Sequence, residues 1–133
     1  MSRLVGCDRT VRHGRMLKAQ QFADAATVVH DLAEEAGGVA DAYITLCVHA
    51  GIAASDVICC ARLGHHAQGE GHHEAVDLLR AAAPGFERHL AALLDMKTKS
   101  GYSHLPATAG EVKRAGRAVE VLLGEARSAH GLN

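Results

Sequence analysis

Hydrophobic residues recur at helical spacing along most of the chain. The first such run follows Gly14. Its apolar residues fall on one face of a helix: Phe22, Ala25, Val29, Leu32 and Ala36. The residues before it are basic and turn-like, and Gly37-Gly38 predicts its end, since glycine is common where a helix stops. A longer, mostly apolar run from about Val39 to Leu63 predicts a central helix contacted on several sides and closed by Gly64.

Three further helices are predicted after a loop over residues 64–71 that holds three glycines. A short helix runs from about His72 to Ala83 and stops at Pro84-Gly85. The next run is amphipathic and ends at a break over residues 101–106. One face of this predicted helix holds Phe86, Leu90, Leu93, Leu94 and Lys97. A capping box at Thr108–Glu111 starts the last helix, because a Glu three residues after a Thr N-cap satisfies a free backbone donor.

The pattern as a whole predicts one helical domain. No segment alternates apolar and polar residues as a half-buried strand does. We therefore predict an all-α fold, an up-and-down antiparallel bundle of four to five helices. A chain of 133 residues suits a single domain over residues 1–133, with its core at about 14–127 and a basic N-terminal segment at 1–13.

Composition narrows the class of protein. A net charge of -1 excludes a generally basic nucleic-acid coat protein and leaves room for a local basic patch. We expect no membrane span, because no 18-residue stretch is free of polar groups, and the N-terminus does not resemble a signal peptide. The cysteines show no C-x-x-C spacing, and we interpret them as buried, reduced thiols of a cytoplasmic protein: Cys7, Cys47, Cys59 and Cys60.

Several segments together resemble the HEPN (higher eukaryotes and prokaryotes nucleotide-binding) family. The first carries Gly14-Arg15, Lys18-Ala19 and Phe22. The others are Asp41-Ala42-Tyr43-Ile44-Thr45-Leu46-Cys47-Val48-His49-Ala50-Gly51-Ile52-Ala53-Ala54-Ser55-Asp56, Leu63-Gly64, His73-Glu74-Ala75-Val76-Asp77-Leu78-Leu79 and Lys97-Thr98-Lys99-Ser100-Gly101-Tyr102-Ser103-His104. The resemblance covers about residues 14–127.

The resemblance implies a bundle of four or five helices that often dimerises. HEPN proteins act as RNA-cleaving toxins, as antiviral effectors, or as non-catalytic modules that bind nucleotides or RNA. The resemblance therefore implies a homodimer, an RNA or nucleotide ligand and an antitoxin partner. Active members cleave RNA without a metal or other cofactor, using an Arg, four to six intervening residues and a His, and two such motifs meet across the dimer.

This chain departs from that motif. No Arg is followed by a His after four to six residues, and the position that matches by context is Lys99 with His104. An ammonium is a point charge and grips phosphate with less geometric precision than a planar guanidinium. Lys99 is a candidate to stabilise phosphate charge and His104 to act as acid or base, while binding without cleavage is the alternative. The expected RNA contacts are Lys97, Ser100, Tyr102, Arg15 and Lys18.

Four histidines lie in and just after the glycine-rich loop: His65, His66, His72 and His73. Together with Glu70 they offer enough donors for zinc or another transition metal. A selective metal site needs fixed geometry, and the glycines of the loop argue against it. The alternative is a polar loop with one structural histidine, His73.

The predicted central helix also carries a polar stripe. At 100° per residue, a sector of about 80° holds Asp41, Thr45, His49 and Asp56. Because buried polar groups need partners, this stripe must face water, a partner chain or a polar network. His49 beside a carboxylate would form an acid–base pair. The alternative is an interhelical hydrogen-bond network that includes Tyr43 and Tyr102.

Basic residues from three parts of the chain would bind phosphate if they shared one face: Arg9, Arg12, His13, Arg15, Lys18, Lys97, Lys99, Lys113, Arg114 and Arg117. A solvated bundle surface is the alternative. The sequence thus leaves three functions open. They are a HEPN-like RNA- or nucleotide-binding protein with or without ribonuclease activity, a non-catalytic dimeric interaction module, and a metal-binding, His-rich helical protein.

Overall fold

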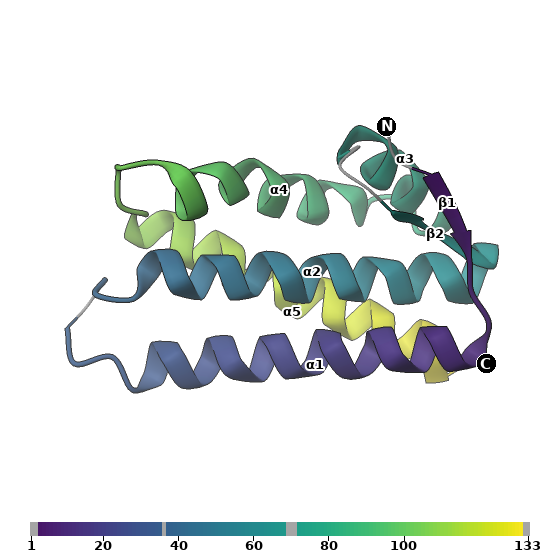
Figure 1. Cartoon of the computed structure of the whole chain (residues 1–133), viewed down its shortest axis with the longest axis horizontal. Coiled ribbons are helices and arrows are strands. Elements are labelled where there is room, and N and C mark those ends of the chain that lie inside the picture. The colour runs from purple at the N-terminus through teal and green to yellow at the C-terminus, as the bar shows by residue number, and fades with distance from the viewer. Residues whose placement is uncertain (1–2, 36, 69–71, 132–133) are drawn as a thin grey trace.

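The computed structural model describes residues 3–35, 37–68 and 72–131, which fold into five helices and one small two-stranded antiparallel sheet (Figure 1). In chain order the elements are β1 (Arg3–Gly6), α1 (Arg9–Asp31), α2 (Ala40–Leu63), β2 (His65–Gln68), α3 (His72–Ala82), α4 (Glu87–Tyr102) and α5 (Ala109–Gly131). The predicted all-α bundle is confirmed.

Helix α2 lies in the middle of the bundle, between α1 and α4, and α5 runs obliquely behind it (Figure 1). Arg15 of α1 meets Asp56 of α2, and Phe22 meets His49, so α1 runs antiparallel to α2. The short α3 covers one end of α2 and α4. The predicted central helix is therefore contacted from several sides, as its apolar sequence indicated.

The buried side of α2 consists of small and branched apolar residues that contact α4 and α5. Ile44, Val57 and Ile58 are at most 1% exposed. At Gly51 the helices come so close that an added Cβ would clash with Leu93 Cδ1 and lie 3.5 Å from Leu122 Cδ1. An alanine at this position would therefore force the fully buried Leu93 side chain to shift in a tightly packed core.

By length and composition, α2 is the one helix in the described ranges that could cross a membrane, with a mean hydropathy of 1.8 over 18 residues. However, 67% of that window is buried inside the bundle. Its place in the core accounts for its hydropathy, because a helix packed on several sides is apolar around most of its circumference. The expected absence of a membrane span stays a prediction.

Local sequence signals correctly predicted two helix boundaries. Gly64 has a left-handed backbone (φ 80°) at the end of α2, and its N–H donates to the Cys60 carbonyl over 3.1 Å. Thr108 and Glu111 form the capping box of α5: the Glu111 N–H donates to Thr108 Oγ1 (3.1 Å), and the Thr108 N–H donates to Glu111 Oε1 (2.9 Å).

Helix α1 begins and ends earlier in the chain than predicted. It begins at Arg9 instead of after Gly14, because the Asp8 carboxylate caps it by accepting the N–H of Val11 over 3.0 Å. It ends at Asp31, ahead of the Gly37-Gly38 pair. Leu32, expected on the buried face, is 75% exposed, so no packing supports a further turn. Ala36, also expected there, lies outside the described residues.

The N-terminal segment forms a strand, which the sequence did not predict. Strand β1 pairs antiparallel with β2, with Leu4 opposite Ala67. Thus His65 and His66, expected in a loop, belong to a strand. Each strand has four residues, too few for a convincing alternation of apolar and polar positions.

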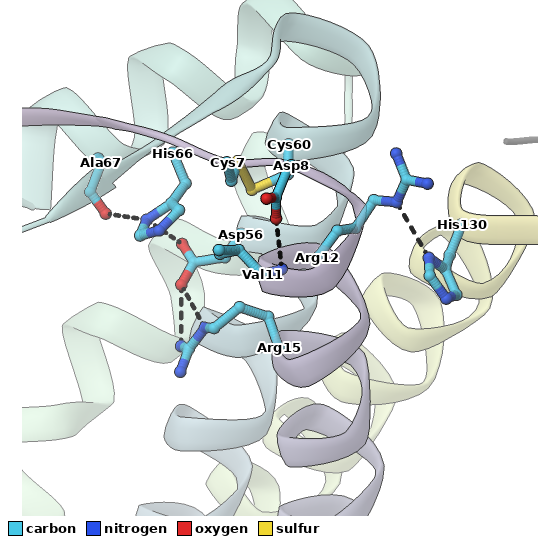
Figure 2. The surroundings of a disulfide bond; sticks show 10 residues. All are labelled: Cys7, Asp8, Val11, Arg12, Arg15, Asp56, Cys60, His66, Ala67 and His130. Atoms are coloured by element: carbon cyan, nitrogen blue, oxygen red, sulfur yellow. Dashed lines mark hydrogen bonds and ion pairs between the residues drawn. A yellow bond between two sulfur atoms is a disulfide. The ribbon is translucent and has the colours of Figure 1, made fainter.

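A disulfide next to this two-stranded sheet joins Cys7 to Cys60, whose Cα atoms are 5.7 Å apart (Figure 2). The prediction that all cysteines are reduced was therefore wrong for these two. It is confirmed for Cys47 and Cys59, which are free and buried. The bond links the start of α1 to the end of α2, two positions that spacing alone does not identify as neighbours.

Replacing Gly51 with Ala should destabilise the protein by about 1–3 kcal/mol, because the added methyl group overpacks the contact among three helices. Chemical denaturation followed by circular dichroism measures this change. Gly124→Ala is the matched control, since nothing lies within 4 Å of a Cβ at that exposed helical position, and it should raise stability by up to about 1 kcal/mol. Equal stabilities of the two variants would contradict the close packing.

Replacing Cys7 with Ser should lower the free energy of unfolding by about 2–4 kcal/mol, because the disulfide links residues separated by 53 positions. Denaturant titration with and without reductant measures the effect. Reductant should bring the wild type to the level of the variant and leave the variant unchanged. A wild-type midpoint that does not respond to reductant would contradict this prediction.

Candidate functional site

The predicted Lys99–His104 segment spans the end of α4 and the start of its connection to α5. Helix α4 continues to Tyr102, two residues into the expected break. The Lys99 ammonium lies 2.7 Å from Glu111 Oε1, and the capping box with Thr108 holds this same carboxylate. The hydrogen bond from Lys99 is the main reason that the pKa of Glu111 falls to about 2. The Lys99 charge is therefore compensated by a fixed carboxylate.

The other residues of the segment divide between the protein interior and solvent. Ser100 accepts a hydrogen bond from Thr45 Oγ1 (3.4 Å) and donates to the Lys97 carbonyl (3.2 Å), so it ties α4 to α2. Tyr102 is 83% exposed, and His104 is exposed in the connection to α5. Lys99 thus pairs with Glu111 and not with His104.

Two more side chains flank the Lys99–Glu111 pair. Tyr102 lies one helical turn after Lys99 on α4, and exposed Arg114 lies one turn after Glu111 on α5. We call these four residues and His104 the α4–α5 corner. It presents a cation, an aromatic ring and an imidazole to solvent around one internal ion pair. Sequence reasoning identified Glu111 only as a capping residue, because its pairing with Lys99 crosses between two helices.

The structure places the basic residues of α1 far from those at the start of α5. Arg12 donates from Nε to His130 Nδ1 over 3.1 Å, which places the start of α1 at the end of α5 (Figure 2). The pKa of His130 is lowered, mainly by burial and next by the charge of Arg12. This favours the neutral imidazole, which can accept the hydrogen bond from Arg12. Arg114 lies 16 residues earlier on α5, a helical distance of about 24 Å.

Two of the other expected RNA contacts, Arg15 and Lys18, lie away from the corner. Arg15 pairs with Asp56 through Nη2 at 2.8 Å, and Lys18 is exposed on α1. Lys97 borders a small cavity of about 90 Å³ between α2, α3 and α4. Of the predicted contacts, the structure brings Ser100 and Tyr102 close to Lys99, and it separates Arg15 and Lys18 from them.

The polar stripe of α2 forms interhelical contacts at its two ends. Asp41 accepts the N–H of Ala107 over 3.2 Å, which holds the connection before α5. Near the middle, His49 is exposed and its ring stacks on Phe22 at 5.3 Å, so its neighbour is a ring and not the expected carboxylate. Tyr43 and Tyr102 do not join this network: Tyr43 faces α5, and Tyr102 faces solvent.

Asp56, at the other end of the stripe, connects three elements beside the disulfide (Figure 2). Arg15 Nε donates to Asp56 Oδ2 over 3.0 Å, and His66 Nδ1 of β2 lies 3.7 Å from Oδ1. Burial raises the pKa of Asp56, while the nearby Arg15 and His66 act in the opposite direction. This cluster holds α1 and β2 against α2.

The predicted metal ligands do not converge in the described part of the chain. His66 faces Asp56, while His72 and His73 are exposed at the start of α3. Within the described ranges, no three His, Cys, Asp or Glu side chains form a group that would hold a metal. Glu70 lies outside those ranges. Binding of zinc or another transition metal stays a prediction.

No family model matches the chain, and no curated protein matches it significantly. The HEPN resemblance therefore depends on the residues quoted above. RNA binding, ribonuclease activity, the homodimer, the antitoxin partner and the cytoplasmic location stay predictions.

Replacing Glu111 with Gln should lower the melting temperature at neutral pH, because Lys99 loses its ionised partner. The pKa of Glu111 is depressed from 4.5 to about 2, so its carboxylate stabilises the fold above about pH 4.5 and loses this effect as the pH falls toward 2. The difference between wild type and variant should therefore shrink over that range. Glu34→Gln, at an exposed turn, is the control. A difference independent of pH would contradict the ion pair.

Proposed function

We propose that this protein is a HEPN-like helical module that binds RNA or a nucleotide at the α4–α5 corner without cleaving it. The observation that carries the proposal is the Tyr102 ring, which is 83% exposed and one helical turn from Lys99, with exposed Arg114 one turn from Glu111, the partner of Lys99. Proteins bind single-stranded RNA by stacking unpaired bases on aromatic rings and by pairing phosphates with cations. The corner offers both, although the net charge of the chain is -1.

Binding is favoured over cleavage because of the state of Lys99. Its ammonium is 2.7 Å from the Glu111 carboxylate, which the capping box holds in place. Stabilising the charge that develops on a phosphate needs a cation directed at that phosphate. His104, the proposed acid or base, lies in the exposed connection and does not pair with Lys99. The corner therefore retains ligand contacts while lacking a positioned catalytic pair.

A dimeric interaction module is the second candidate function, and α1 supplies the observation that favours it. Leu17 and Val28 are 58% and 54% exposed, and they lie on one side of the helix, three turns apart. Exposed apolar side chains on one helix face are typical of protein contact surfaces. In this proposal a second copy of the chain covers that face. The HEPN resemblance adds a homodimer and an antitoxin as expected partners.

Titration of a fluorescently labelled single-stranded RNA, followed by anisotropy at low salt, tests the preferred function. Tyr102→Ala should weaken binding about tenfold through lost stacking. Arg114→Gln should also weaken it and reduce the salt dependence. Arg88→Gln is the control, because it removes an exposed charge near the start of α4, at the end of that helix away from the corner. If Tyr102→Ala binds as tightly as the wild type, the corner is not the site.

The same labelled RNA, incubated with wild type and His104→Ala and separated on a denaturing gel, tests the absence of cleavage. Both proteins should leave the RNA intact. Products that form with the wild type and disappear with His104→Ala would overturn the non-catalytic part of the proposal.

A further inference from the structure

A groove between α1 and α5 lies apart from the α4–α5 corner. The two helices meet near one end, where Arg127 Nη2 donates to Gln20 Oε1 over 2.6 Å. Toward the start of α5 they separate, as the oblique path of α5 behind α2 indicates (Figure 1). The space between them is a cavity of about 660 Å³ with Tyr43 and Cys47 of α2 on its floor. This volume is in the range of small-molecule sites, roughly 300–1,000 Å³.

An aromatic ring and a thiol, those of Tyr43 and Cys47, form the floor of the groove. The Tyr43 hydroxyl approaches α5 where Gly116 leaves room, since a Cβ there would be 2.6 Å from Tyr43 Oη. The His30 ring lies 5.2 Å from the Tyr43 ring at 53°. Burial raises the pKa of Tyr43 to about 12 and that of Cys47 to about 11, so both stay protonated at neutral pH. The floor is therefore suited to holding a ring and lacks a thiolate nucleophile.

The α5 rim of the groove carries two available cations. Lys113 and Arg117 are exposed and one turn apart on the same side of the helix. In the described part of the chain, no carboxylate lies within ion-pair distance of either. With Arg127, three cations border the groove against two carboxylates, Asp24 and Glu120. Two unpaired cations side by side favour an anionic group.

We infer that this groove binds a small organic anion with a flat, apolar body. The anionic group lies between Lys113 and Arg117, and the body lies against Tyr43 and His30. A second cavity of about 440 Å³ shares His30, Val112 and Lys113 with the groove and is lined mainly by alanine and valine side chains, with Glu35 at its edge. It provides room for an apolar end of the ligand. The site is independent of RNA binding at the corner.

Isothermal titration with naphthalene-1-sulfonate tests this site. The wild type should bind the sulfonate, and Lys113→Gln/Arg117→Gln should weaken binding about tenfold or more through loss of charge-assisted contacts. Lys18→Gln/Arg88→Gln is the matched control, because it removes the same charges from exposed positions outside the groove and should bind as the wild type does. No binding by the wild type, or equal binding by the groove variant, would overturn the proposal.

Two further ligands test the two parts of the chemistry. Inorganic phosphate, which has the charge without the ring, and neutral 1-naphthalenemethanol, which has the ring without the charge, should each bind more weakly than the sulfonate. Equal affinity for either one would overturn the proposed ligand class. Amide shifts on sulfonate addition should centre on Tyr43 and Gly116, and shifts centred on Tyr102 would overturn the location. None of these titrations contains RNA, so their failure and that of the proposed function are distinguishable.

Discussion

The need to bury α2 determines where the other long helices lie. Apolar side chains such as Ile44, Val57 and Ile58 each gain about 1.5–3 kcal/mol on full burial, which favours covering this helix from several sides. Glycine and alanine between them let α4 and α5 approach closely, as at Gly51. Because α1 and α5 both pack on α2 and meet each other near one end, a groove remains between them. Tyr43 and Cys47 of α2 line this groove.

The polar stripe of α2 has a different task from its apolar sides: it attaches the connecting segments. Asp41 binds the backbone before α5, and Asp56 holds Arg15 of α1 and His66 of β2. Each of these half-buried carboxylates needs such partners, because an unpaired charge away from water is costly. One helix therefore supplies both the core of the bundle and the fixed points for its chain ends and connections.

Local signals predicted much of this fold, and contacts between distant segments were the part that could not be predicted. Helical spacing, Gly64 and the Thr108–Glu111 capping box depend on neighbouring residues and were readable in the sequence. The Cys7–Cys60 bond and the Arg12–His130 contact join residues that only the folded chain brings together. The local cap at Asp8 was also readable, but the basic residues around it suggested a turn.

The candidate site shows the same division. Lys99 and His104 were found from their spacing, yet Lys99 engages Glu111 on another helix, and that pairing changes what the segment can do. Tyr102 was expected among the RNA contacts, but its 83% exposure depends on where α4 ends relative to α5. The groove at Tyr43 and His30 had no signal in the sequence, because it exists only through the angle between two helices.

The disulfide also changes the connectivity of the molecule. With Cys7 joined to Cys60, helix α1, the following turn and most of α2 belong to one covalent ring, and α3 to α5 form a tail that leaves it. A single break anywhere inside the ring opens it but leaves both parts attached. The segment after α1, where Glu34 and Glu35 are exposed, is therefore a place where the backbone can be cut without dividing the protein in two.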